Sequence, residues 1–176
     1  VHGDIDPIKD IEVINLELVL ADLQSVSKRL QSVERDAKRG DKAAIAEEAA
    51  LKVVYQDLEQ GRFASLDIPS LQLLTRKPIM YVLNKKAGGH NLDEMKDERF
   101  TRLTEYLTNL GSPYVIVDAA IENEVNEVSG EDKQTFRQED GVLNDGIDDL
   151  IRGAYKLLGL QSYFTTGEDE TRAGTT

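Results

Sequence analysis

Two short apolar runs, Lys77-Pro-Ile-Met-Tyr-Val-Leu-Asn84 and Tyr114-Val-Ile-Val-Asp118, decide how the second half of the chain folds. Each is rich in the β-branched and aromatic residues that favour a strand. Between them, Asn91 with Glu94 three residues later predicts a helix start, and the apolar stripe that follows ends at Gly111. A strand, a helix and a second strand within about 40 residues predict a parallel unit with a right-handed crossover.

The residues after this unit predict more helix and little more sheet. Asp118-Ala-Ala-Ile-Glu122 predicts a second turn from a strand into a helix. Further helix starts are predicted at Ser129 with Asp132 and at Asp145, and we expect the polar tail from Thr165 to be loose. Two strands alone are marginal in water, so we expect strands outside this chain to complete the sheet.

The first 76 residues predict a pair of antiparallel helices. Asp6 followed by Pro7 is typical of a helix start. Arg39-Gly40-Asp41 predicts the turn, Gly61 the end of the second helix, and residues 69–74 a short helical piece. The first helix carries apolar residues with the 4-3-4-3-4 spacing of a coiled-coil seam, at Val19, Leu23, Val26, Leu30, Val33 and Ala37. The apolar face of the second helix consists of Ala44, Leu51, Val54 and Leu58.

The composition excludes several classes of protein. The chain has 176 residues, a formal charge of −12, no cysteine and only two histidines, so neither a disulfide framework nor a cysteine–histidine metal site is expected. No run approaches the roughly 18 apolar residues of a membrane span, and no signal peptide is recognisable. We therefore expect a soluble cytoplasmic protein with no membrane partner, and Val1 in place of Met predicts a piece of a longer chain. The carboxylates around Glu122 are expected to be solvated helix ends rather than a metal site.

Candidate ligand-binding residues follow both predicted strands, at the edge where open α/β sheets bind ligands. Asn84 and Lys85 end the first strand, and Ala119 and Ala120 follow the second. For a nucleotide base bound here, we expect the Asn84 amide to join the two loops and the Lys85 stem to lie along the ring. The N–H groups of Ala119 and Ala120 are then expected to contact ring heteroatoms. The same residues also fit an ordinary turn that binds nothing.

Four blocks of the chain resemble one family over nearly the whole length. They are residues 4–18, residues 77–84, Ala119-Ala-Ile-Glu-Asn-Glu124, and residues 151–173, which run from Ile-Arg-Gly-Ala-Tyr to Glu-Thr-Arg-Ala. These blocks are similar to the YchF, or Obg-like ATPase, branch of the Obg-related P-loop NTPases. The resemblance implies a helical hairpin inserted into a Ras-like nucleotide-binding domain. It also implies a protein that binds and hydrolyses ATP, or GTP in some members, with Mg²⁺, and that associates with ribosomes.

On the basis of this resemblance we expect three parts. Residues 1–76 are the helical insertion with its coiled-coil hairpin, and residues 77–160 are the carboxyl-terminal part of the nucleotide-binding domain. Residues 161–176 are a linker toward a TGS domain outside the chain. The expected fold class is therefore α/β with a large helical part, in which a parallel βαβ unit represents part of a Ras-like P-loop NTPase domain.

The family's base-binding residues can be carried over one by one. The resemblance implies that Asn84 is the asparagine of the base-specificity loop and that Lys85 meets the adenine through its backbone. Ala119 and Ala120 are then the second base-contacting loop. At Ala87 the family usually has Glu, and relatives specific for guanine have Asp. Because a carboxylate there would accept hydrogen bonds from guanine N1 and N2, its absence removes the usual source of guanine preference. We therefore expect the site to tolerate adenine, the alternative being a pocket that is less selective between the two bases.

The sequence contains no phosphate-binding half of such a site. None of the 13 glycines is followed by lysine, so no G-x-x-x-x-G-K-[ST] loop is present to hold phosphates and Mg²⁺. No aspartate stands three residues before a glycine, so the switch motif is absent too. We therefore expect this chain alone to be inactive as an ATPase and to hold no nucleotide tightly. Its expected partner is the rest of the nucleotide-binding domain.

The predicted hairpin tip is basic on an acidic protein. Residues 28–42 carry six basic and three acidic side chains, although the whole chain has a charge of −12. This charge favours contact with ribosomal RNA, yet the surfaces of paired helices are often simply rich in charge. The alternative to a nucleotide-handling protein is a non-enzymatic coiled-coil module that docks on ribosomal RNA or a protein partner. The candidate contact residues at the tip are Arg35, Lys38, Arg39 and Lys42.

Overall fold

The computed structural model describes residues 5–86, 88–127, 146–167 and 170–176. The chain divides into two units between Lys77 and Pro78. The helix starts predicted at Ser129 and Asp145, and the substitution at Ala87, lie outside the described residues.

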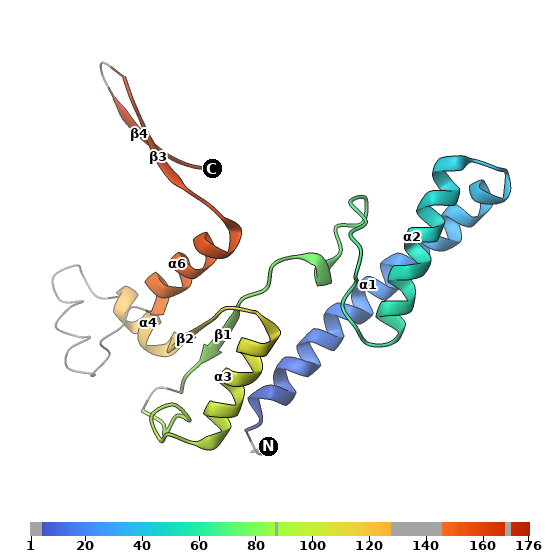
Figure 1. Cartoon of the computed structure of the whole chain (residues 1–176). Helices are drawn as coiled ribbons and strands as arrows, with labels where there is room; N and C mark the ends of the chain where they lie inside the picture. Colours follow the sequence, from blue (N-terminus) through green and yellow to red (C-terminus); the bar gives the residue numbers. More distant parts are fainter. Residues whose placement is uncertain (1–4, 87, 128–145, 168–169) are drawn as a thin grey trace. The chain divides into compact units, whose positions relative to one another are not determined.

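The first unit is built on a hairpin of two long helices, α1 (Pro7–Lys38) and α2 (Lys42–Glu59) (Figure 1). As predicted, the Asp6 carboxylate caps α1 by accepting a hydrogen bond from an N–H of its first turn. The turn between the helices places Gly40 at a φ of +87°, which glycine adopts without strain. The carboxylate of Asp41 then accepts hydrogen bonds from two N–H groups in the first turn of α2. Local sequence therefore determines both helix ends that meet at the tip.

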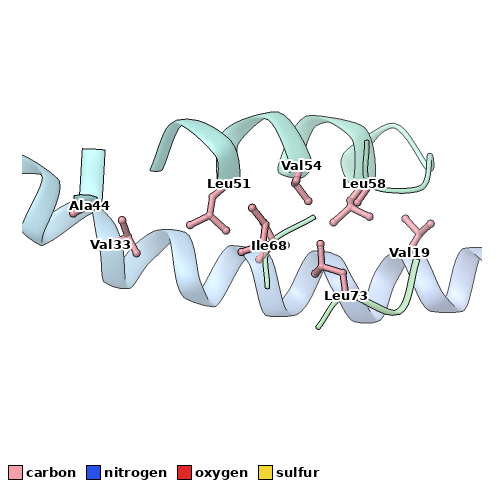
Figure 2. Packing of buried hydrophobic residues seen from close by; sticks show 10 residues of the cluster. Val19, Val33, Ala44, Leu51, Val54, Leu58, Ile68 and Leu73 are labelled. Atoms are coloured by element: carbon pink, nitrogen blue, oxygen red, sulfur yellow. The ribbon is translucent and has the colours of Figure 1, made fainter. Parts of the chain in front are cut away.

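An apolar seam holds the two helices together (Figure 2). Valines seven residues apart on α1 are buried, namely Val19, Val26 and Val33. All four residues expected on the apolar face of α2 are buried too, and Leu51 is fully inaccessible. Ile68 and Leu73, from the segment after α2, pack into the same cluster. Beside the seam, the Arg29 guanidinium donates two hydrogen bonds to the Glu47 carboxylate, at 2.7 and 2.8 Å.

The segment after α2 packs against α1 and is held there by one buried side chain. Asp22, which is 3% exposed, accepts hydrogen bonds from the N–H groups of Leu74 and Thr75 at 2.9 and 2.8 Å. It also accepts one from the Thr75 hydroxyl at 2.7 Å. The helical piece predicted over residues 69–74 is wrong, because a turn stands there and a 3₁₀ helix, η1 (Leu74–Arg76), follows it. Because Asp22 accepts hydrogen bonds from the N–H groups at the start of η1, the helical turn begins at Leu74 and not at Pro69.

The second unit contains the predicted parallel strands. Strands β1 (Tyr81–Asn84) and β2 (Tyr114–Val117) pair in parallel, and helix α3 (Glu98–Leu110) connects them (Figure 1). The last residues of the two strands, Asn84 and Val117, lie opposite each other in the register. The loops that follow β1 and β2 therefore leave the sheet at the same edge.

The start of α3 differs from the prediction. The helix begins after Asp97, whose carboxylate accepts a hydrogen bond from the Arg99 N–H, and not at Asn91. Lys96 has a φ of +52°, which interrupts a helical path before that cap. The Asn91 side chain instead bonds the backbone of Lys86, accepting from its N–H and donating to its carbonyl. Asn91 therefore closes a loop, a role that asparagine takes as readily as helix capping.

Among its described residues, the rest of the unit contains two helices and a second pair of strands. Helix α4 (Ala119–Glu127) begins where predicted, and α6 (Gly146–Leu158) packs against β2. The tail expected to be loose forms an antiparallel hairpin of β3 (Ser162–Thr166) and β4 (Thr171–Thr175). Its threonines are polar yet β-branched, so a polar tail still pairs. No helix in the described part of the chain is long and apolar enough to span a membrane.

Candidate functional site

One hydrogen bond joins the loops that follow the two parallel strands. Asn84, at the end of β1, accepts through Oδ1 from the N–H of Ala119, at 3.1 Å. The two residues are 35 positions apart in the chain, and both are exposed. The structure therefore brings together the two loops that the sequence predicts to share an edge, with Asn84 as the residue that joins them.

The N–H groups of the second loop have acceptors within the chain. Ala119 donates to Asn84, and the N–H groups of Ala120 and Ile121 donate to the Asp118 carboxylate, each at 3.1 Å. The expected contact of the Ala119 and Ala120 N–H groups with ring heteroatoms therefore does not match this geometry. Short Asn and Asp side chains commonly take the first donors of a helix, and they do so here. Both alanines are exposed and remain accessible for apolar contact.

Asn84 keeps a hydrogen-bond donor for a ligand. Its Oδ1 accepts from Ala119, which fixes the orientation of the amide, because only the oxygen can accept from an N–H. Its Nδ2 makes no hydrogen bond to any of the residues that the structure describes. An exposed amide donor at this edge suits a ligand that offers a ring nitrogen or a carbonyl oxygen as acceptor.

Lys85 is held at both its backbone and its ammonium group. Its N–H donates to the Val117 carbonyl at 2.7 Å, which extends the pairing of β1 and β2. Its ammonium contacts the Asp93 carboxylate at 3.0 Å and also contacts Glu94. Partial burial opposes the charged form, but the hydrogen bonds to Glu94 and Asp93 prevail and raise the pKa of Lys85. The Lys85 side chain is therefore charged, and its two carboxylate partners hold it in one orientation beside the loop that contains Asn84.

Asp93 and Glu94 belong to the candidate site, although the sequence did not predict them as site residues. The signal was present, because Asn91 and Glu94 have the spacing of a helix cap. In the structure Glu94 does reach back to the Asn91 N–H, at 3.4 Å, but no helix follows. Instead, the hydrogen bond from Lys85 lowers the pKa of Glu94, so this carboxylate stays charged beside the lysine.

The structure exposes all four candidate contact residues of the hairpin tip, Arg35, Lys38, Arg39 and Lys42. Lys38 makes an ion pair with Glu34 at 3.9 Å, and Arg39 makes one with Asp36 at 3.2 Å. The side chains of Lys38 and Arg39 are nevertheless 79% and 80% exposed, so solvent screens these pairs strongly. The tip therefore presents its cations to solvent.

These features define a class of protein. It is a mixed α/β protein that carries a long helical hairpin and has polar loops at the carboxyl edge of two parallel strands, where α/β sheets bind ligands. Across the described ranges, no three acidic or histidine side chains gather so that they could hold a metal ion. A scan against protein-family models finds no match for the chain.

Individual proteins do match. The chain is 40% identical over 184 residues to the ribosome-binding ATPase YchF of Bacillus subtilis (strain 168) and 39% identical over 184 residues to that of Escherichia coli O157:H7. Each alignment covers 99% of this chain and 50% of the relative. A solved structure, that of the Schizosaccharomyces pombe YchF GTPase, matches with a TM-score of 0.78 at 27% identity. That match covers 100% of this chain and 50% of the other.

Over nearly its whole length, the chain is similar to proteins of the YchF family. It spans about half the length of the curated relatives it matches. The resemblance inferred from the four sequence blocks is thereby confirmed, and the fold is YchF-like.

Proposed function

We propose that this chain supplies the base-recognition edge and the helical arm of a ribosome-associated protein that binds and hydrolyses ATP. The proposal rests chiefly on the hydrogen bond from the Ala119 N–H to Asn84, which joins two exposed loops at the carboxyl edge of parallel strands. The family relationship supports it, because the matched bacterial relatives are named ribosome-binding ATPases. The proposed architecture is part of a Ras-like P-loop NTPase domain that carries a coiled-coil insertion.

A purine suits the groups at this edge. The Nδ2 of Asn84 can donate to purine N7, an acceptor that adenine and guanine share. The Lys85 stem, held in place by Asp93 and Glu94, can cover one face of the ring. Because both carboxylates are already bonded to Lys85, the ammonium is held away from the ring and the apolar stem is left to stack.

Three alanines, Ala87, Ala119 and Ala120, determine whether the site prefers adenine or guanine. Ala119 and Ala120 offer only apolar contact, since their N–H groups are occupied. Ala87 cannot accept hydrogen bonds from guanine N1 and N2 through its side chain. We therefore propose that the site prefers adenine and binds guanine less tightly.

Phosphate chemistry is proposed to lie with the partner of this chain, the rest of the nucleotide-binding domain. The sequence has no glycine-rich phosphate loop, and among the described residues no three acidic or histidine side chains gather as metal ligands would. Phosphate contacts and the metal supply most of the positioning in phosphoryl transfer. The chain alone is therefore expected to bind a nucleotide weakly through its base and not to hydrolyse it.

An equilibrium titration of the purified chain with ATP, GTP and CTP tests the base site. We expect ATP to bind more tightly than GTP, and CTP not to bind measurably. Asn84→Ala should weaken ATP binding by about 5–10-fold, because it removes both the base donor and the tether of the second loop. Asn109→Ala, at an exposed position of α3, is the matched control and should change the affinity less than twofold. Equal binding by Asn84→Ala and the unmodified chain contradicts the proposal.

A second candidate function, RNA contact by the hairpin tip, is favoured by the exposure of its four cations. Co-sedimentation with ribosomes at rising salt concentration tests it. Neutralising Arg35, Lys38 and Arg39 together should weaken binding and lower the salt dependence by about two to three ion equivalents. Neutralising three exposed lysines elsewhere, Lys9, Lys52 and Lys156, should not. Ribosome binding without any nucleotide binding would favour the non-enzymatic module.

A further inference from the structure

Glu122 was expected to be a solvated carboxylate at a helix end, and the structure contradicts this. The side chain is 6% exposed and stands on the first turn of α4. Its Oε1 accepts a hydrogen bond at 2.8 Å from the N–H of Gly146, the first residue of α6. A carboxylate is also favoured by the partial positive charge at a helix N-terminus. Glu122 therefore caps a helix other than its own.

The contact between α4 and the start of α6 is tight. A Cβ atom on Gly146 would come within 3.2 Å of Glu122 Oε1 and within 3.3 Å of both Val117 Cα and Cγ1. A side chain at position 146 would therefore require these neighbours to move by a few tenths of an ångström, and glycine lets α6 begin against the last residue of β2 without such a shift. The carbonyl of the same Val117 accepts from the Lys85 N–H at 2.7 Å. The capped helix start thus adjoins both loops of the proposed base site.

Glu122 is part of the turn that forms the second loop. Its N–H donates to the Asp118 carbonyl at 3.0 Å, and the Asp118 carboxylate accepts from Ala120. At the front of the same turn, Ala119 is bonded to Asn84. The turn that carries both alanines is therefore held from two directions, by Asn84 on one side and by the bond between Glu122 and α6 on the other.

We propose that Glu122 is a positioning residue for base recognition, which fixes the turn of Ala119 and Ala120 against Asn84 by capping α6 and does not touch the nucleotide. This inference rests on the proposed function. The Gly146 N–H requires an acceptor and no particular charge. Base affinity should therefore follow the presence of an acceptor at position 122.

The experiment uses the full chain with Glu122→Ala, Glu122→Gln and the control Glu124→Ala, an exposed position of the same helix. ATP affinity is measured by titration, and amide hydrogen exchange at Ala119 and Gly146 is measured by NMR without nucleotide. Glu122→Ala should weaken ATP binding about fivefold or more and speed exchange at both amides by about tenfold. Glu122→Gln keeps an acceptor and should retain both properties within about twofold. Glu124→Ala should leave both unchanged.

Unchanged ATP affinity in Glu122→Ala overturns the positioning role. So does a loss of affinity with unchanged exchange at Ala119, which would indicate direct contact with the nucleotide. If the unmodified chain binds no ATP, the proposed function and this role in it both fail. Faster exchange in Glu122→Ala then still shows that the bond holds the loop, so the two failures can be told apart. If Glu122→Ala does not fold, Glu122→Asp, which is one methylene too short to reach Gly146, should show the same losses, and normal affinity there overturns the proposal.

Discussion

Replacing Asp22 by asparagine should detach the segment that follows α2 from α1. The two carboxylate oxygens accept three hydrogen bonds from Leu74 and Thr75, and Asp22 and Thr75 are both buried. In Asp22→Asn the amide oxygen can keep the two bonds to Thr75, but the NH₂ group then faces the Leu74 N–H, donor against donor. One donor left without a partner costs about 1–3 kcal/mol, and the other two bonds lose their charge assistance. The free energy of unfolding of the first unit should therefore fall by about 2–3 kcal/mol.

Urea unfolding followed by far-UV circular dichroism measures this loss. Glu17→Gln is the matched control, since it also neutralises a carboxylate on α1 but at an exposed position, and it should change the free energy of unfolding by less than about 0.5 kcal/mol. Asp22→Ala, which removes every acceptor, should cost more than Asp22→Asn. A change below about 0.5 kcal/mol in Asp22→Asn would refute the view that this carboxylate fastens the returning segment.

Three further changes test the first unit. Leu51→Ala should lower its free energy of unfolding by about 2–5 kcal/mol in a thermal or urea scan, because Leu51 is fully inaccessible in the seam. Gly40→Ala should cost about 1 kcal/mol in the same scan, because its φ of +87° is strained for any residue with a Cβ. The third test measures how the free energy of unfolding depends on pH in the acid range. Hydrogen bonds from Ser65 and Arg62 lower the pKa of Asp57 from 3.8 to about 2. Its contribution is therefore complete above pH 3.8 and is lost as the pH falls toward 2. Asp57→Asn should flatten that part of the profile.

The helical hairpin could be predicted from the sequence because its signals are local. Asp6 and Asp41 cap their own helices, and Gly40 takes the left-handed conformation that ends α1. The seam follows from periodicity, since every valine expected at its centre is buried. The helical piece expected at residues 69–74 was misplaced, because the decisive partner, Asp22, lies about fifty residues away in sequence.

The second unit shows the same division between local and distant contacts. The parallel pairing of β1 and β2 and the meeting of Asn84 with Ala119 follow from the strand pattern. Asn91 has the residue type and spacing of a cap, and only the backbone at Lys96 shows that no helix can start there. The burial of Glu122 depends on α6, which approaches it from 24 residues further along, so no local pattern marks it.

The most direct test of the base site is an NMR titration of the isotopically labelled chain with ATP, in which each backbone amide reports its own surroundings. The account predicts saturable shifts at Lys85, Ala119 and Ala120, larger with ATP than with CTP, while the amides of α2 stay where they are. The account would be contradicted if only amides of the α1–α2 hairpin shifted, or if the amides of Lys85, Ala119 and Ala120 did not shift at millimolar ATP.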